Sequence, residues 1–142
     1  MSNYYSDGIA EIPLLADGDL TEHQWEFVAP ASTVGYAASC DSGCNPIPLG
    51  ILTNNPSAGQ EATVKALGFT KAKARCNGCD LDHGAYCFGA SDAFLEPISS
   101  HTGTQIALAR WFGPKVVTTD ASVIGCIQWL GGGGAGCATT GS

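Results

Sequence analysis

Cysteine is the residue type in this sequence whose number and spacing could support chemistry. The 142-residue chain contains 7 cysteines and 3 histidines. Two cysteine pairs are closely spaced, with three and two residues between their members, and another cysteine follows with a histidine in between. Zinc prefers thiolate and imidazole ligands, usually four in a tetrahedron. The residues that could provide such a site are Cys76, Cys79, His83 and Cys87, with Cys40 and Cys44 as alternatives.

The same cysteines support two other interpretations. Cys40 and Cys44 could form a disulfide bond, with two further bonds among the later five cysteines and one thiol left over. Alternatively, several cysteines could be free and buried, acting as small apolar residues. That role suits Cys126, which lies in the apolar run 123–127, whereas Cys137 could tie down the C-terminal segment. The spacing leaves zinc, disulfides and free thiols open.

Catalytic motifs are lacking. None of His23, His83 and His101 stands beside a nucleophile in a recognised motif. The pair Cys76 and Cys79 has the spacing of a redox site, but the alternation of strands and helices that supports a thioredoxin-like site is missing. The four glycines at 131–134 are not followed by the residues of a phosphate-binding loop. We therefore expect a protein that is not an enzyme and has no cofactor, zinc excepted.

Composition predicts an all-β fold. Charged residues make up 13% of the chain, hydrophobic residues 44%, and there are 19 glycines. Few charges and many glycines suit short strands joined by tight turns. Helix formers are never sustained over ten residues at helical spacing. With 142 residues, the chain is long enough for one well-packed core. We predict one domain over residues 1–142, a small β-barrel or sandwich with an N-terminal arm (1–15) and a flexible glycine-rich tail (131–142).

The charge distribution limits the partners. The net charge is −7, and the first basic residue along the chain is Lys65. Nucleic-acid binding needs clustered lysine and arginine, so we expect no nucleic-acid partner. No run of 18 apolar residues and no targeting segment is visible, so we also expect no membrane partner. The acidic N-terminal third is either a solvated surface or a region that docks on a basic protein.

Short segments with strand character follow one another at regular spacing, which is typical of barrels and sandwiches. Tyr4–Leu15 could be an arm or a first edge strand, since Pro13 suits an edge. The segment 104–112 fits a strand or a short helix, and its alternation favours a strand. The remaining predicted strands are 24–29, 33–39, 48–53, 62–74, 85–90, 93–98, 116–117 and 123–130.

The segment 62–74 has the clearest pattern in the chain. Small residues occupy one set of alternate positions, and Leu67, Phe69 and three lysines occupy the other. Successive side chains of a strand point to opposite faces, so the small residues predict close packing against another layer. The opposite face of the strand would be partly exposed to solvent or would contact a partner. Gly68 predicts a bulge or bend, and 54–59 predicts a turn.

The run GILTNNPSAGQEATVKALGFTKAKA, residues 50–74, resembles the central signature of bacteriophage capsid decoration (cement) proteins. Weaker similarity extends to Gly18–Thr21, Phe27–Val28 and Val123–Ile127, and the cysteine-rich segment 76–87 lies outside the pattern. The matching positions are Gly50, Ile51, Leu52, Asn54, Asn55, Pro56, Ala58, Gly59, Ala62, Thr63, Val64, Gly68, Lys71 and Ala74.

The resemblance implies a structural virion protein, made in the host cytoplasm, that binds the outer capsid surface and cements neighbouring major-capsid subunits. It also implies an oligomer, most simply a homotrimer. Disulfides could form once the virion leaves the reducing cytosol. Aromatic side chains dominate interface energies, and lysines could pair with acidic capsid loops or be solvated. The interface candidates are Trp25, Phe27, Lys65, Phe69, Lys71, Lys73, Trp111 and Phe112.

Each aromatic candidate could instead pack in the core. Two other functions also fit the sequence. One is a small zinc-binding or redox module, based on the cysteines. The other is an adhesion module displayed on the virion, which would bind a host-surface glycan through exposed aromatic side chains.

Overall fold

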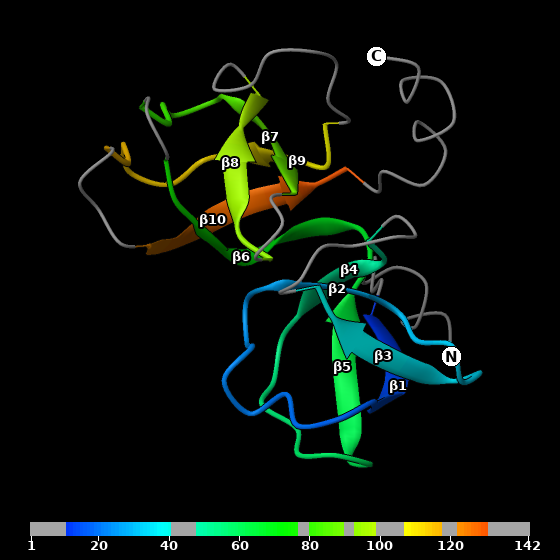
Figure 1. Ribbon diagram of the computed structural model, residues 1–142. Coiled ribbons are helices and arrows are strands. Elements are labelled where there is room, and N and C mark those ends of the chain that lie inside the picture. The colour runs from blue at the N-terminus through cyan, green and yellow to red at the C-terminus, as the bar shows by residue number, and fades with distance from the viewer. Residues whose placement is uncertain are drawn as a thin grey trace.

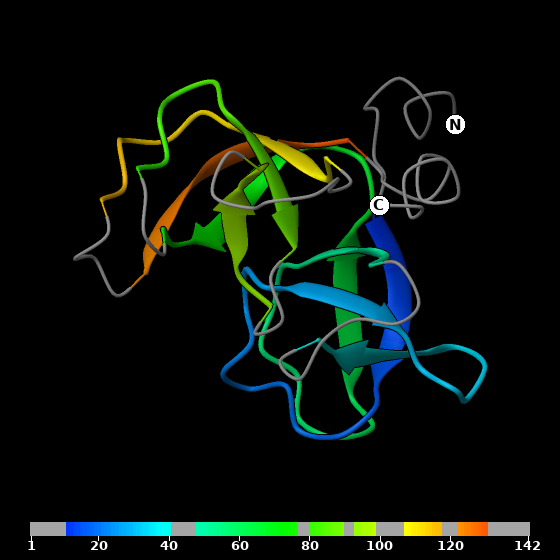
Figure 2. The ribbon, with the colours of Figure 1, turned by 45° about the horizontal axis from the view of Figure 1, so that its top comes forward.

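The structure, a computed structural model, describes residues 11–40, 48–76, 80–89, 93–98, 107–117 and 122–130. These residues form ten strands and no α-helix. The strands build two closed five-stranded barrels, which lie next to each other in Figures 1 and 2. The all-β barrel prediction is therefore confirmed. No helix in the described ranges has the length and apolar character to span a bilayer.

The first barrel contains the N-terminal strands. Its members are β1 (Glu11–Ala16), β2 (Phe27–Pro30), β3 (Tyr36–Ser39), β4 (Gly50–Leu52) and β5 (Glu61–Lys65). The strand order is β1-β3-β2-β4-β5, and β1 closes the barrel by pairing antiparallel with β5. β1 also pairs with β3, in parallel. The expected N-terminal edge strand is therefore wrong for 11–16, because closure gives β1 a neighbour on both sides. The rest of the predicted arm lies outside the described residues.

The second barrel contains the C-terminal strands. Its members are β6 (Gly68–Ala74), β7 (Tyr86–Gly89), β8 (Leu95–Pro97), β9 (Ala109–Trp111) and β10 (Val123–Trp129). The order is β10-β6-β8-β7-β9, and pairing of β9 with β10 closes it. Of the predicted segment 104–112, residues 107–112 are described, and within them 109–111 form a strand. In the predicted strand 116–117, Val116 forms an isolated bridge with Leu81. The predicted tail at 131–142 lies outside the described residues.

The chain passes from one barrel to the other within the stretch predicted as a single strand. The alternation is confirmed, because Ala62, Val64, Ala72 and Ala74 are all buried. However, the first two are in β5 and the last two in β6, so one periodic pattern serves two barrels. The strand is interrupted at residues 66–67. Gly68, which begins β6, has a φ of +93°. The predicted bend at Gly68 is thus confirmed, since glycine adopts positive φ without steric cost.

The loop between β4 and β5 forms the predicted turn. The Asn54 side chain donates to the carbonyl of Glu61 and accepts from the amide of Thr63, at 2.9 and 3.0 Å. Gly59 has a φ of +81°. Asparagine and glycine thus act here as their turn preferences predict.

The core consists of two clusters of buried residues, whereas we expected one. The smaller lies inside the first barrel and includes Val28 and Leu52. The larger fills the second barrel and extends to Phe27 and Ile51. In a strand, neighbouring residues point to opposite faces, so β2 and β4 contribute to both clusters. The Phe27 ring lies so close to Gly89 of β7 that a Cβ there would be 2.8 Å from it.

Trp111 organises the second barrel. It is fully buried, and its indole nitrogen donates to the carbonyl of Pro114 at 2.7 Å. Its ring packs on Gly125 of β10, where a Cβ would lie 2.5 Å from a ring carbon. Gly125 pairs with Ala72 of β6. Ala72 and Ala74 are buried in the same core cluster as Trp111, so the predicted packing of the small residues is confirmed for these two.

Trp25 joins the two barrels through its backbone. Its amide donates to the carbonyl of Leu52 in β4 at 2.7 Å, and its carbonyl accepts from the amide of Lys73 in β6 at 2.8 Å. The residue has a φ of +71°, which is rare for a non-glycine residue. These hydrogen bonds to both barrels hold Trp25 in that conformation.

Candidate interaction surface

The outer side of the second barrel presents aromatic and cationic side chains in a cross-strand row. Tyr86 of β7 pairs with Arg110 of β9, Arg110 with Gln128 of β10, and Gln128 with Phe69 of β6. Residues opposite each other on one face are neighbours, so the row spans roughly 14 Å across four strands. We call this surface, together with Lys71 of β6 and Phe112 just after β9, the aromatic–cation face.

Rings and cations contact one another on the aromatic–cation face. The Arg110 guanidinium carbon lies 5.3 Å from the centre of the Tyr86 ring and 5.6 Å from that of Phe112. Phe112 and Phe69 have ring centres 6.1 Å apart, so they meet above β10. The His83 ring packs edge-on against Phe112 at 5.7 Å. Despite these contacts Phe69 is 62% exposed and Tyr86 50% exposed. The face therefore leaves apolar area open to solvent.

The cations of this face differ from Lys73, Arg75 and Lys115 in forming no ion pair with a carboxylate of the described residues. Elsewhere, Lys73 pairs with Glu26, Arg75 with Glu96, and Lys115 with Asp80 and Asp82. Within the described ranges, neither Lys71 nor Arg110 has an ion pair. Instead, Lys71 lies 5.7 Å from the Trp25 ring centre, and Arg110 donates from Nε to the Gly84 carbonyl at 3.0 Å.

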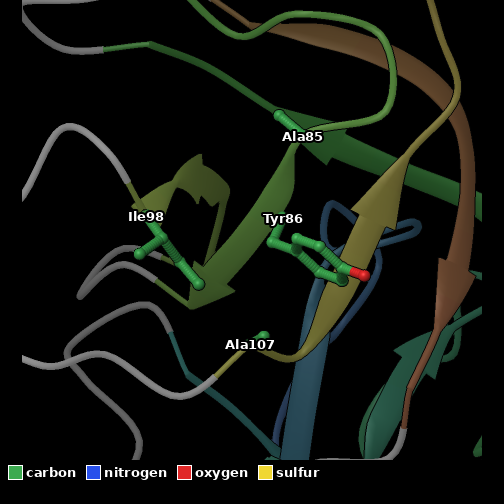
Figure 3. A pocket seen from close by; sticks show the side chains of 4 residues that line it. All are labelled: Ala85, Tyr86, Ile98 and Ala107. Carbon is green, nitrogen blue, oxygen red and sulfur yellow. The ribbon is translucent and has the colours of Figure 1, made fainter.

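An apolar hollow adjoins Tyr86. Its walls are formed by Ala85, Tyr86, Ile98 and Ala107, and its volume is about 460 Å³. Figure 3 shows these side chains around it. The hollow is open and carries almost no polar surface, so it suits contact with an apolar side chain better than recognition of a polar small molecule.

The sequence candidates for the interface separate into several environments. Phe69, Lys71 and Phe112 gather on the aromatic–cation face. Phe27 and Trp111 are buried in the larger core cluster, so they cannot contact a partner in this conformation. Trp25 is half-buried between the barrels, and Lys73 is half-buried in its ion pair with Glu26. Lys65 is half-buried and lies in β5 of the first barrel.

Sequence reasoning missed Tyr86 and Arg110. The sequence alternation grouped Arg110 with Ile106 and Leu108, which did not mark it as an outward residue. The structure buries Ala109 and Trp111 on either side of Arg110 and so places Arg110 on the outer side of β9. The sequence pattern also could not show that β7 and β10 are the neighbouring strands.

The cysteines lie in different environments. Cys40 is buried and disulfide-bonded, while Cys76 and Cys87 are buried thiols. Cys126 is an exposed thiol on the outer side of β10, so the expectation that it is buried is wrong. In the pattern of β10 the inward positions are Val123, Gly125, Ile127 and Trp129, which leaves Cys126 on the opposite face. Cys44, Cys79 and Cys137 lie outside the described residues.

The structure gives the zinc hypothesis no site in the part of the chain that it describes. No group of three or more His, Cys, Asp or Glu side chains there is arranged to hold a metal ion. His83 packs on Phe112 and belongs to the aromatic contacts instead. Cys79, one of the candidate ligands, is outside the described ranges, as is His101.

No protein-family model matches the sequence, and no curated protein sequence matches it. The fold does have a similar solved structure, the N base of head fibre gp8.5 of bacteriophage phi29. The match has a TM-score of 0.54 and 10% sequence identity, and it covers 86% of this chain and 94% of that chain. The two chains therefore share a fold. At this identity the likeness carries no residue-level correspondence.

Proposed function

We propose that this protein is a structural component of a phage virion that binds the outer surface of the assembled capsid and cements neighbouring major-capsid subunits. The observation that carries the proposal is the shared fold with a bacteriophage head fibre base over nearly the whole of both chains. The resemblance of residues 50–74 to capsid decoration proteins, drawn from sequence, points the same way. These two lines of support come from different properties of the chain.

The aromatic–cation face supports the binding part of this proposal. Exposed aromatic and arginine side chains are typical anchors of protein interfaces. A cement protein works by mass action, because a ligand that binds only the assembled shell stabilises that state by its binding free energy. Neither catalysis nor a nucleic-acid partner is needed for this function. A homotrimer is the oligomer that we propose, since it matches a threefold position of the shell.

A titration onto capsids tests this function. Capsids are prepared from a phage that lacks the gene, the purified protein is added, and occupancy is measured by cryo-electron microscopy. We expect saturable density at fixed lattice positions and greater resistance of the shell to heat. Absence of density on both the expanded and the unexpanded shell would overturn the proposal.

Adhesion to a host-surface glycan is the second candidate function. The exposed rings of Phe69 and Tyr86 favour this function, because a sugar ring can pack against the face of an aromatic side chain. If adhesion is the function, virions that carry this protein bind to host cells. The protein then remains on the capsid surface without stabilising the capsid. Cell-binding assays with decorated and undecorated virions separate the two functions.

A further inference from the structure

We propose that the aromatic–cation face binds an acidic segment of a protein partner, with carboxylates on Arg110 and Lys71 and an apolar side chain against Phe69 and Phe112. The partner's chemistry goes beyond the function proposed above. Where that partner is taken to be the capsid, the inference rests on the proposed function.

Arg110 is held ready for a carboxylate. Its Nε donates to the Gly84 carbonyl at 3.0 Å, and its guanidinium lies against the rings of Tyr86 and Phe112. These contacts hold the group in place, and among the described residues no carboxylate forms an ion pair with it. A planar guanidinium can bind a carboxylate through two parallel hydrogen bonds. Because the side chain is already ordered, binding loses less conformational entropy.

Lys71 supplies a second cation two strands away. It lies across from Cys126 of β10, whereas Arg110 lies across from Gln128, so the Cα atoms of the two residues are on the order of 10 Å apart on the same side of the sheet. The Phe69–Phe112 ring pair lies between β6 and β9. The arrangement therefore fits two carboxylates on either side of an apolar side chain.

The charge of the whole protein narrows the class of partner. The chain has a net charge of −7, so an anionic partner is repelled except where local cations are unpaired. Two isolated cations are too few for a nucleic-acid backbone, which needs several phosphate contacts. An acidic loop bearing an aromatic or aliphatic residue needs only two cations and an apolar contact. Charge complementarity at this face thus favours an acidic protein segment.

The first test uses small probes and does not depend on capsids. The capped peptide Glu-Trp-Glu is titrated into the ¹⁵N-labelled protein, with Lys-Trp-Lys as the charge-reversed probe, and backbone amide shifts are followed by NMR. We expect Glu-Trp-Glu to shift the amides of Lys71, Arg110 and Phe112, and added salt to reduce the effect. Lys-Trp-Lys should leave these amides in place. Equal shifts with both peptides, or shifts only elsewhere, would overturn the inference.

The second test uses the capsids of the proposed function. R110Q and K71Q each remove one cation from the face, and K115Q removes one cation that is already paired with Asp80. We expect R110Q and K71Q to weaken capsid binding about tenfold, with R110K intermediate and K115Q unchanged. Wild-type affinity in R110Q and K71Q would overturn the inference and leave the proposed function standing. Failure of the wild-type protein to bind capsids would overturn the proposed function, and the peptide test then decides the inference.

Discussion

Lys73 and Glu26 form an ion pair between the two barrels, with the Lys73 Nζ 2.9 Å from Glu26 Oε2. Lys73 belongs to β6 of the second barrel, and Glu26 directly precedes β2 of the first. The other carboxylate oxygen of Glu26 lies 2.7 Å from Nδ1 of His23. The Glu26 side chain is only 8% exposed. One buried carboxylate thus connects the two barrels, beside the backbone hydrogen bond between Lys73 and Trp25.

Replacing Lys73 should destabilise the fold. K73M keeps the length of the side chain and removes the ammonium, which leaves Glu26 buried with His23 as its remaining side-chain partner. Removing one member of a buried pair leaves an uncompensated charge, and for this partly buried pair we expect a loss of about 1–3 kcal/mol. Thermal unfolding followed by circular dichroism measures the change.

K115M is the matched control for K73M. Lys115 and Asp80 are both about half exposed, and exposed ion pairs contribute roughly 0–1 kcal/mol. An equal fall in the unfolding temperature for both variants would contradict a special role of the Lys73–Glu26 pair.

Adding a methyl group at Gly125 should disturb the packing of Trp111. A Cβ there would lie 2.5 and 2.7 Å from two carbons of the indole ring, so G125A forces the ring or the strand to move. Overpacking of this kind costs about 1–3 kcal/mol. Chemical denaturation with urea measures the free energy of unfolding.

A double-mutant cycle with W111F identifies the clash as the cause. Phenylalanine lacks the second ring that meets Gly125, so G125A should cost less in the W111F background than in the wild type. Additive effects of the two substitutions would contradict the contact as the source of the destabilisation.

Gly68 is required for its backbone conformation rather than for space. Its φ is +93°, and the nearest atom to an added Cβ is a Lys65 side-chain carbon at 4.0 Å. G68A should therefore destabilise the protein by about 1–2 kcal/mol through backbone strain alone. G68N should cost less, because asparagine tolerates positive φ better than alanine. Equal stability of the two variants in urea would rule out this explanation.

The stability of the protein should fall in alkaline solution through Cys87. Burial raises the pKa of this thiol from 9.0 to about 12. Above pH 9 the unfolded chain loses the proton while the folded chain keeps it, so the free energy of unfolding decreases until about pH 12. Below pH 9 the contribution is fully present.

C87A is the comparison for this pH dependence. Urea unfolding of both proteins is measured from pH 7 to pH 11, in steps of about one pH unit. We expect a shallower alkaline decline for C87A, whatever its stability at pH 7, because the titrating thiol is gone. Parallel curves would show that other groups account for the decline.

The sequence by itself determined the strand character of the chain and the face on which many side chains lie. Alternation placed Ala62, Val64, Ala72 and Ala74 on a buried side and Phe69 and Lys71 on an exposed one, as the structure has them. This works because successive side chains of a strand point to opposite faces, which is a local property of the backbone. The bend at Gly68 and the turn around Asn54 are also local, and they too were predictable.

Only the tertiary structure decided which strands are neighbours. The closure of two barrels depends on the pairing of β1 with β5 and of β9 with β10, between segments distant in sequence. The same pairing brings Tyr86 to Arg110 and buries Trp111 against Gly125, which alternation could not reveal. A period of two fixes the face of a residue but carries no information about its cross-strand partner. The core and the aromatic–cation face both depend on those partners.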